Sequence, residues 1–311
     1  MKVFMLPSLA QSQGRHGGIS RVIESYHEHA PKFGIEYVNN IQLCDLFASH
    51  AGAGYSSTGQ WPDVVHSHGF YWSNDYPIGK THLEINRKII EEIRHAKETT
   101  VPSPWVAKTF QRDMRFSPTI LPHGIDWEIW QGGENHDFVL WNKNRPSDAC
   151  TPEAVTFLAE EFPSQTFVST FIESPLPNVE VTGALPFAQM MNVIKAAGIY
   201  LSTARETFGI GCLEAMASGS PVLGWNYGGN RSLIKHGHTG YLAEPGNWED
   251  LAQGLEYCQK YRIQLGENAR ESARHYTWDN TMEILVGVYK RAMKGHERPM
   301  FIDESAYKII T

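Results

Sequence analysis

The sequence predicts an α/β protein that contains two parallel sheets, one in each half of the chain. Short apolar runs alternate with stretches of helical spacing, and several runs end in a polar or glycine-rich loop, as is typical of parallel α/β sheets. The alternation is interrupted once, in the polar segment 124–136 with its Gly132-Gly133 pair, and a new series follows. A chain of 311 residues is also long enough for about two domains.

The first half is predicted to contain four strands and three helices. The strands are short apolar or β-branched runs at residues 3–6, 63–68, 99–102 and 119–121. The helices place apolar residues three or four positions apart, with charges between them, at residues 20–29, 81–97 and 104–114. Because the chain becomes polar soon after its first apolar run, we interpret that run as a buried strand and not as a signal peptide.

The second half is predicted to contain five strands and five helices. The strands are expected at residues 138–141, 166–171, 179–182, 199–202 and 221–223. The helices are expected at residues 152–161, 187–197, 210–217, 248–261 and 277–294. The last helix lies far from the strands of its half in sequence, so we expect it to pack back on the first half. This gives domains at 1–132 and 133–290, with a segment 291–311 that packs on the first domain.

Composition excludes several classes of protein. Hydrophobic residues make up 41% of the chain and charged residues 20%, so it is able to form packed cores. The formal charge of −7 argues against a chain-wide basic face for nucleic acid or anionic lipid. No apolar run approaches the length of a membrane-spanning helix. The four cysteines lie far apart and form no C-x-x-C pair, so we expect reduced thiols and a cytoplasmic protein.

The segment 205–222 carries the strongest chemical signal. Glu206 and Glu214 flank Gly209 and Gly211, and a helix is expected to begin near Gly209. The amides and dipole at such a helix start favour an anion such as a diphosphate, and carboxylates accept hydrogen bonds from paired hydroxyls. From spacing alone, helix-capping acids in an ordinary loop explain the two glutamates equally well. A dinucleotide site is disfavoured, because Glu214 stands where the fingerprint needs its third glycine.

The stretch from Ser202 to Val222 resembles the signature S-x-x-E-x-F-G-x-x-x-x-E-A-M-A-x-G-x-P-V of the retaining nucleotide-sugar glycosyltransferases of family 4. Further similarities are Gly228-Gly229, the segment 238–242 and the segment 276–278. The resemblance implies the GT-B fold: two Rossmann-like β/α/β domains facing across a cleft, with the C-terminal helix crossing back to the first domain.

The first half resembles the family in three shorter segments. Gly17-Gly18-Ile19-Ser20 is similar to the family's glycine loop, and the segment 63–68 is similar to its D-V-V-H-x-H strand. Leu121–Asp126 is similar to P-N-G-V-D, with His123 in place of the usual asparagine.

The resemblance implies roles for particular residues. Glu206 would hold hydroxyls of the donor sugar, Glu214 would hold the ribose, and the amides of Gly17 and Gly18 would approach the diphosphate. His68 would lie beside the sugar, so His68 and Glu206 are the candidate catalytic residues. The residues whose amides would contact the sugar and phosphates are Phe208, Gly209, Ile210 and Gly211.

Two of these assignments have alternatives. His66 competes with His68, because alternation along a strand would put both on one face. Leu185, which follows Thr182-Gly183-Ala184, stands where the family places the nucleobase, although it serves equally well as a core residue.

The sequence departs from the family between residues 141 and 148. Lys143 stands where the family has an arginine, Arg145 is the candidate for the second cation, and the usual lysine position corresponds to Asp148. Two cations in this segment would neutralise a diphosphate leaving group. The alternative is a solvated surface turn.

The resemblance also implies a reaction. A sugar would move from a nucleotide diphosphate donor to an acceptor hydroxyl with retention, by front-face transfer in which the donor phosphate takes the acceptor proton. No cofactor or metal is expected, since the sequence has no D-x-D and no third ligand near His66 and His68. The alternatives are a non-catalytic nucleotide-sugar-binding protein and an epimerase or phosphorylase of the same fold.

The aromatic residues of the first half suggest an acceptor surface. Tyr71, Trp72 and Tyr76 are interleaved with polar residues and would stack on a flat acceptor. The favoured interpretation is that these rings cover the core of a thin domain. A small molecule or glycan is favoured as acceptor over a lipid or a nucleic-acid base. No motif indicates the donor's base and sugar or an oligomeric state.

Overall fold

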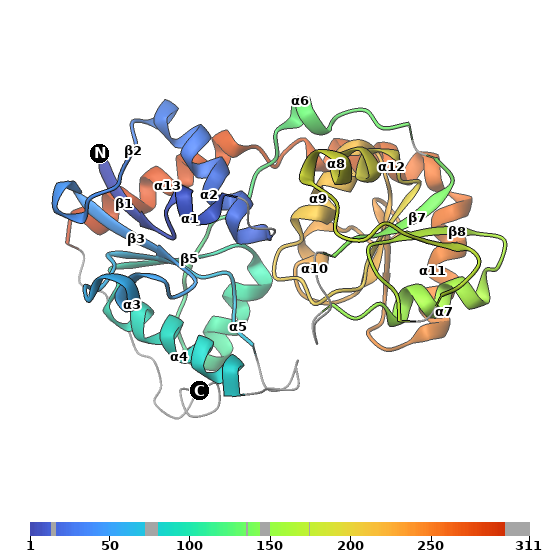
Figure 1. The fold of residues 1–311 in the computed structure, drawn as a ribbon, viewed down its shortest axis with the longest axis horizontal. Coiled ribbons are helices and arrows are strands. Elements are labelled where there is room, and N and C mark those ends of the chain that lie inside the picture. The colour runs from blue at the N-terminus through green and yellow to red at the C-terminus, as the bar shows by residue number, and fades with distance from the viewer. Residues whose placement is uncertain (14–16, 72–79, 135, 144–149, 174, 296–311) are drawn as a thin grey trace. The chain divides into compact units, whose positions relative to one another are not determined.

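The computed structural model describes residues 1–13, 17–71, 80–134, 136–143, 150–173 and 175–295. The chain divides into two compact units, which we call unit 1 (Met1–Gly124 with Trp278–Thr311) and unit 2 (Ile125–Thr277) (Figure 1). The boundaries therefore fall at Gly124 and Trp278, and not at 132 and 290 as predicted. The physical reason is packing: α6 (Trp127–Trp130) contacts α9 (Ile210–Ser218) of unit 2, and α13 (Trp278–Met293) packs on unit 1 from its first turn.

Unit 1 contains a six-stranded sheet with the strand order β2-β1-β3-β4-β5-β6, in which every pair is parallel. Its strands are β1 (Lys2–Leu6), β2 (Glu36–Val38), β3 (Leu46–His50), β4 (Val64–His66), β5 (Glu98–Val101) and β6 (Thr119–Ile120). Its helices are α1 (Leu9–Ser12), α2 (Gly18–His29), α3 (Gly54–Thr58), α4 (Lys80–His95), α5 (Pro104–Met114) and α13, with short 3₁₀ helices at Ala30–Phe33 and Ile41–Leu43. Helices α2 and α13 lie on one face of the sheet, and α3, α4 and α5 lie on the other (Figure 1).

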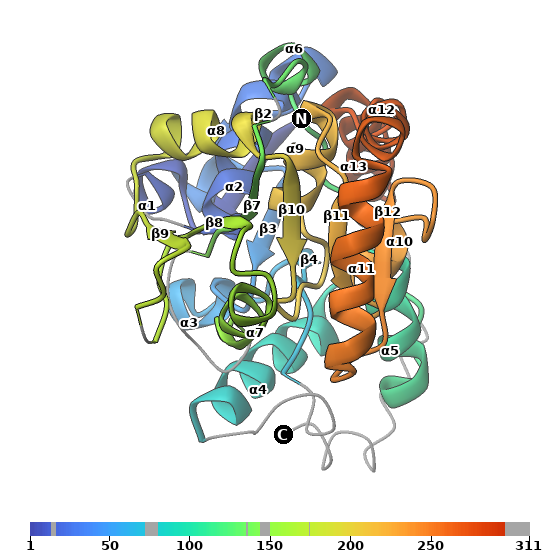
Figure 2. The same ribbon diagram turned by 90° about the vertical axis from the view of Figure 1, so that its right-hand side faces the viewer.

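Unit 2 contains a second six-stranded parallel sheet, with the strand order β12-β11-β10-β7-β8-β9. Its strands are β7 (Phe138–Trp141), β8 (Thr166–Ser169), β9 (Val179–Val181), β10 (Ile199–Ser202), β11 (Val222–Trp225) and β12 (Gly240–Ala243). Its helices are α6, α7 (Glu153–Glu161), α8 (Phe187–Ala196), α9 (Ile210–Ser218), α10 (Asn230–Leu233), α11 (Trp248–Lys260) and α12 (Arg262–Ala273). Figure 2 shows α11 along one side of strands β10, β11 and β12.

Alternate residues of the unit 2 strands enter two separate cores, one on each face of the sheet. Leu140 and Tyr200 pack in the core under α8, α9 and α12. Val139, Ile199 and Leu201 pack in the core under α7 and α11. This is the two-residue period of a strand that is covered on both faces, and it explains why the strands are continuous apolar runs in the sequence.

Helix α13 belongs to unit 1 because its apolar stripe and its charged end both bind there. Its buried residues are Trp278, Thr281, Met282, Leu285, Val288, Tyr289 and Ala292. Beyond this stripe, the Arg291 guanidinium contacts the Glu98 carboxylate of β5 at 3.1 and 3.2 Å. The predicted return of the last helix to the first half of the chain is therefore confirmed.

The prediction omitted three strands and one long helix: β2, β3, β12 and α12. Strand β3 is buried along its whole length, yet it ends in Ser49-His50. Polar residues at the end of so short a run conceal it, because hydrophobic periodicity needs several apolar positions to be visible. Helix α12 is mostly polar and includes Gly266, which also weakens its helical pattern.

Each sheet has one position where the chain reverses the direction in which successive strands are added. In unit 1 it lies between β1 and β3, and in unit 2 between β7 and β10. Ligands of open parallel sheets bind beyond the carboxyl ends of the strands at such a position. Among the described residues, no helix combines the length and the apolar character needed to cross a bilayer.

The packing of α13 predicts unequal effects of two neighbouring substitutions. Leu285 is 0% exposed and Ile284 is 38% exposed. Leu285→Ala should lower the free energy of unfolding by about 2–5 kcal/mol, because it opens a cavity. The matched change Ile284→Ala should cost less than about 1 kcal/mol. Urea denaturation of both variants measures this, and equal losses would contradict the described packing.

Candidate functional site

The reversal point of unit 2 holds an ion pair between Lys143 and Glu206. Lys143 is the second residue after β7, and Glu206 lies in the loop between β10 and α9. Lys143 Nζ is 2.8 Å from Glu206 Oε1, and the two side chains are 10% and 31% exposed. The Lys143 amide also donates to Thr170 Oγ1 at 2.9 Å, which anchors the backbone beside β8. The pair thus joins the carboxyl ends of the two strands at which ligands of this fold class bind.

Glu206 keeps Lys143 charged. Burial by itself favours the neutral amine, but the Glu206 carboxylate beside it outweighs burial and raises the pKa of Lys143. The hydroxyl of Tyr200, the thiol of Cys150 and the hydrogen bond to Glu206 act in the same direction. Lys143 is therefore a fixed positive charge at neutral pH. Arg145 and Asp148, the other residues named for this segment, lie outside the described residues.

Helix α9 begins next to the Glu206 loop, as the sequence predicts. Gly209 is its N-cap residue, with φ +97°, a left-handed conformation that favours glycine. The first intrahelical bond runs from the Leu213 amide to the Gly209 carbonyl at 3.0 Å. The amides of Ile210 and Gly211 precede it and so have no partner inside the helix, which leaves them for an anion.

Gly211 has a steric explanation of its own. A Cβ atom at this position would lie 2.6 Å from the Tyr200 hydroxyl. That hydroxyl donates to Asn142 Oδ1 at 2.6 Å, next to Lys143. The glycine therefore lets α9 pack against β10 and the segment after β7, whether or not a ligand contacts its amide. Sequence reasoning missed Tyr200 and Asn142, which carry no motif.

The loop after β11 holds the Glu206 backbone in place. The Gly229 amide donates to the Glu206 carbonyl at 2.8 Å, and a Cβ on Gly228 would collide with that carbonyl oxygen. Asn230 follows, and its Nδ2 donates to the Ser202 carbonyl at 2.8 Å while its Oδ1 accepts from Ser202 Oγ at 2.8 Å. The Gly228-Gly229 motif therefore orients the loop that carries Glu206.

The other residues predicted on the donor side also lie in unit 2. Glu214 is the fifth residue of α9 and is 1% exposed. Phe208 is buried and meets Tyr276 edge to face, with ring centroids 6.2 Å apart. Leu185 is half-buried in the turn between β9 and α8.

In unit 1, the predicted glycines open a helix. Gly17 is the N-cap residue and Gly18 the first residue of α2, so the first amides of this helix have no intrahelical partner. A Cβ atom at Gly18 would meet no atom within 4 Å among the described residues. The loop with these glycines connects β1, by way of the short helix α1, to α2. Strand β1 is one of the two strands at the reversal point of the unit 1 sheet.

His66 and His68 both lie against the ring of His50, with centroid distances of 4.6 and 5.3 Å, but their hydrogen bonds differ. Strand β4 ends at His66, and His68 lies beyond it. The two ring nitrogens of His66 are hydrogen-bonded inside the core, Nδ1 to Thr100 Oγ1 at 2.7 Å and Nε2 to Tyr289 OH at 3.2 Å. His68 is half-buried, and its Nε2 lies 3.0 Å from Nδ1 of His50, a residue that sequence reasoning missed.

Burial keeps these histidines neutral. It lowers the pKa of His66 to about 3, with a further contribution from the nearby charge of His68, and it lowers the pKa of His68 to about 4. At neutral pH both imidazoles are therefore uncharged. Neither of them is a cation for a diphosphate, and their chemistry is hydrogen bonding.

Of the aromatic residues between 70 and 76 in unit 1, one lies in the core, one is half-buried and two lie outside the described residues. Tyr71 is tied to the buried Asn86 by two backbone bonds, at 3.0 and 2.7 Å, and its ring stacks on His82 at 4.2 Å. Phe70 stacks on Phe110 in the core at 4.8 Å. Trp72 and Tyr76 lie outside the described residues. Tyr71 thus remains a half-buried candidate for an acceptor contact.

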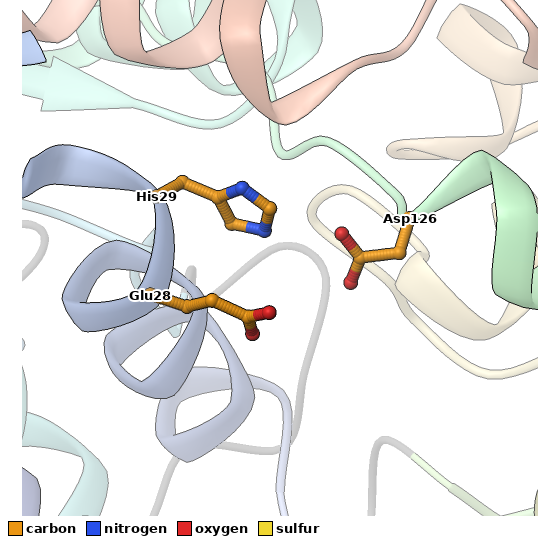
Figure 3. Close-up of side chains that lie close together, drawn as sticks. All are labelled: Glu28, His29 and Asp126. Carbon is orange, nitrogen blue, oxygen red and sulfur yellow. The ribbon is translucent and has the colours of Figure 1, made fainter. Parts of the chain in front are cut away.

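One set of acidic and histidine side chains has the composition of a metal site. Figure 3 shows Glu28 and His29 on the last turn of α2 and Asp126 before α6. Helix α2 belongs to unit 1 and Asp126 to unit 2. Within either unit, this set supplies at most two ligands, fewer than the three or four protein ligands of a zinc site. Neither unit by itself therefore provides a metal site from this set.

Comparison with known proteins agrees with the motifs of unit 2. Residues 172–275 match the family model described as glycosyl transferases group 1. The chain is 32% identical over 109 residues to a D-inositol 3-phosphate glycosyltransferase of Corynebacterium urealyticum, which covers 34% of this chain and 26% of that protein. It is 35% identical over 100 residues to an uncharacterized glycosyltransferase of Methanocaldococcus jannaschii, covering 31% of this chain and 26% of that protein. The chain thus spans about a quarter of the length of these curated relatives.

Solved structures resemble nearly the whole chain. Sucrose-phosphate synthase from Thermosynechococcus elongatus has a TM-score of 0.76 at 14% identity, covering 94% of this chain and 99% of that one. HepE of Anabaena, solved with UDP-glucose, has a TM-score of 0.74 at 15% identity, covering 93% of this chain and 99% of that one. Identities this low show the fold alone. The chain has the GT-B fold, with two Rossmann-like units, and residues 172–275 carry its similarity to group 1 glycosyltransferases.

Proposed function

We propose that this protein is a retaining glycosyltransferase that moves a sugar from a nucleotide diphosphate donor to an acceptor hydroxyl without a metal ion. The observation that carries the proposal is the Lys143–Glu206 pair, 2.8 Å across, at the reversal point of unit 2. It places a fixed cation and a hydroxyl-binding carboxylate beside the N-terminus of α9. A donor of this class presents matching groups, an anionic diphosphate next to a ring of hydroxyls.

The leaving diphosphate would be stabilised by positive charge and by amides. Lys143 supplies the charge, and the Ile210 and Gly211 amides supply hydrogen-bond donors that need no rearrangement during the reaction. On the sequence resemblance alone, we also assign the Gly17 and Gly18 amides to donor binding, together with Arg145, which lies outside the described residues. Because Lys143 is held by Glu206 and the two amides are fixed at the start of α9, we propose that no metal ion is required.

The sugar and the nucleoside would be held by carboxylates. When Lys143 pairs with the diphosphate in place of Glu206, the Glu206 carboxylate can accept hydrogen bonds from sugar hydroxyls. The buried Glu214 accepts hydrogen bonds from the ribose hydroxyls. We assign His68 to the donor sugar. This assignment is supported by His66, whose two ring nitrogens are already hydrogen-bonded within the core.

Transfer would proceed on one face of the sugar. The acceptor oxygen bonds to the anomeric carbon on the side from which the diphosphate departs, the bond between that carbon and the phosphate oxygen breaks, and the acceptor proton passes to the departing phosphate. This route needs positioning more than it needs a protein base, which agrees with the neutral, weakly basic His68.

The comparisons suggest the substrates to test first. The curated relatives include enzymes named for D-inositol 3-phosphate, and HepE was solved with UDP-glucose. We therefore propose uridine diphosphate sugars as donors and a small molecule or glycan hydroxyl as acceptor. The four cysteines are free, which supports a reducing compartment such as the cytoplasm.

One experiment tests the function. The full chain is incubated in EDTA with a panel of nucleotide sugars and acceptor hydroxyls, and the anomeric configuration of the product is read by NMR. Retention in EDTA supports the proposal, whereas inversion or a metal requirement contradicts it. Conversion of the donor without an acceptor, or a requirement for inorganic phosphate, indicates an epimerase or a phosphorylase. Donor binding without turnover indicates a binding protein.

Lys143→Met should lower kcat/KM for the donor by about 10²–10³-fold, because one preorganised electrostatic contact to the leaving group is lost. Lys143→Arg keeps the charge and should retain most of the activity. Lys235→Met is the matched control, since Lys235 is exposed in the same unit. Steady-state kinetics measure all three, and a Met variant within twofold of wild type would argue against Lys143 at the diphosphate.

Glu214→Gln should weaken the binding of a free nucleoside diphosphate by about 10–100-fold, because hydrogen bonds to a charged group contribute about 1.5–3 kcal/mol. The exposed Glu256→Gln in α11 is the control and should bind like wild type. Isothermal titration calorimetry measures both. Equal weakening of a 2′,3′-dideoxy nucleotide, which lacks the ribose hydroxyls, would contradict the assigned contact.

A further inference from the structure

A buried histidine at the end of β3 contacts the candidate catalytic histidine. His50 is the last residue of β3 and is 0% exposed. Its Nδ1 lies 3.0 Å from His68 Nε2, and the two rings stack at a centroid distance of 5.3 Å with an angle of 22°. Strand β3 pairs with β1 at the reversal point of the unit 1 sheet, so this contact occurs where ligands of the fold class bind.

The direction of this hydrogen bond follows from the other nitrogen of His50. Two neutral imidazoles share one hydrogen bond only when one donates and the other accepts. His50 Nε2 is buried and has no hydrogen-bond partner among the described residues. Burying an unpaired N–H there is less tolerable than burying an unpaired lone pair. The His50 proton therefore resides on Nδ1, and His50 donates to His68.

The neighbouring groups leave this arrangement undisturbed. His66 lies beside His50 in register on β4, with ring centroids 4.6 Å apart, but its two nitrogens bind Thr100 and Tyr289. Tyr26 meets the His50 ring edge to face at 5.6 Å, and His123 lies 5.7 Å from the His68 ring. Among the described residues, no carboxylate is hydrogen-bonded to either member of the pair.

This hydrogen bond determines which ring nitrogen of His68 carries the proton. A neutral imidazole has one N–H, so if Nε2 accepts from His50, the proton of His68 must be on Nδ1. We propose that His50 is a positioning residue, which fixes His68 as the Nδ1-protonated tautomer and makes it a hydrogen-bond donor to an oxygen of the bound sugar or acceptor. His68 in this form offers no lone pair to a substrate hydroxyl. The catalytic consequence rests on the proposed function, and the tautomer does not.

The tautomer is measured directly on the full chain. Histidine is labelled with ¹⁵N, and long-range ¹H–¹⁵N correlation spectra identify the protonated nitrogen of each ring; the His68 signals are assigned by their loss in His68→Gln. Wild type should show His68 protonated on Nδ1. His50→Asn should preserve this, because its amide nitrogen occupies nearly the place of the His50 Nδ1 donor. Protonation of His68 on Nε2 in wild type would overturn the proposal.

His50→Gln and His50→Leu remove the donor from that place and should shift His68 toward the Nε2-protonated form. The polar Gln variant serves if the Leu variant fails to fold, and thermal unfolding checks both. An unchanged His68 tautomer in a folded variant would overturn the proposal.

Kinetics test the positioning role. His50→Gln should lower kcat about 2–10-fold, the contribution of one neutral hydrogen bond, with a smaller change in KM, and His50→Asn should recover most of that loss. Equal kcat values for the two variants would reject the positioning role. A wild-type protein that turns over no sugar nucleotide would reject the proposed function, while the NMR result would still decide the tautomer.

Discussion

The adjacency of β7 and β10 is the constraint on which the candidate donor site depends. These strands are paired in parallel, Ile199 with Val139 and Tyr200 with Leu140, although nearly sixty residues separate them in sequence. Because parallel strands end at the same edge of the sheet, the pairing brings Lys143 to Glu206. A cation and a carboxylate at this edge, close to a helix N-terminus, form one electrostatic site that neither residue would provide alone.

Hydrogen bonds from neighbouring segments hold the backbone around Lys143 and Glu206. The Gly228-Gly229 backbone holds the Glu206 carbonyl, and Tyr200 with Asn142 fixes the other side. Both arrangements need residues without a Cβ, so these glycines serve packing as much as ligand approach. The contact between Lys143 and Glu206 also limits the free-energy cost of keeping a partly buried cation.

Unit 1 uses the same principle with neutral groups. Its β3 and β4 strands place His50 and His66 side by side, and their burial leaves uncharged imidazoles that act through hydrogen bonds. The ring nitrogens of His66 are hydrogen-bonded inside the core, and one of their partners is Tyr289 of α13. His68, beyond the strand, is the one partnered by His50. The C-terminal helix thus contributes to the packing of the same region that carries the candidate catalytic histidine.

The sequence by itself determined the α/β class, most strands of both sheets, the start of α9 at Gly209 and the position of Glu206 just before that helix, because these depend on local periodicity and on a dense motif. It missed β3 and therefore His50, whose signal is one buried histidine at the end of a short run. It left the choice between His66 and His68 open, because the hydrogen bonds that distinguish them are made to residues of other strands and of α13. Only the tertiary structure decided which side chains meet, because strand pairing joins residues far apart in the chain, and local sequence does not specify that pairing.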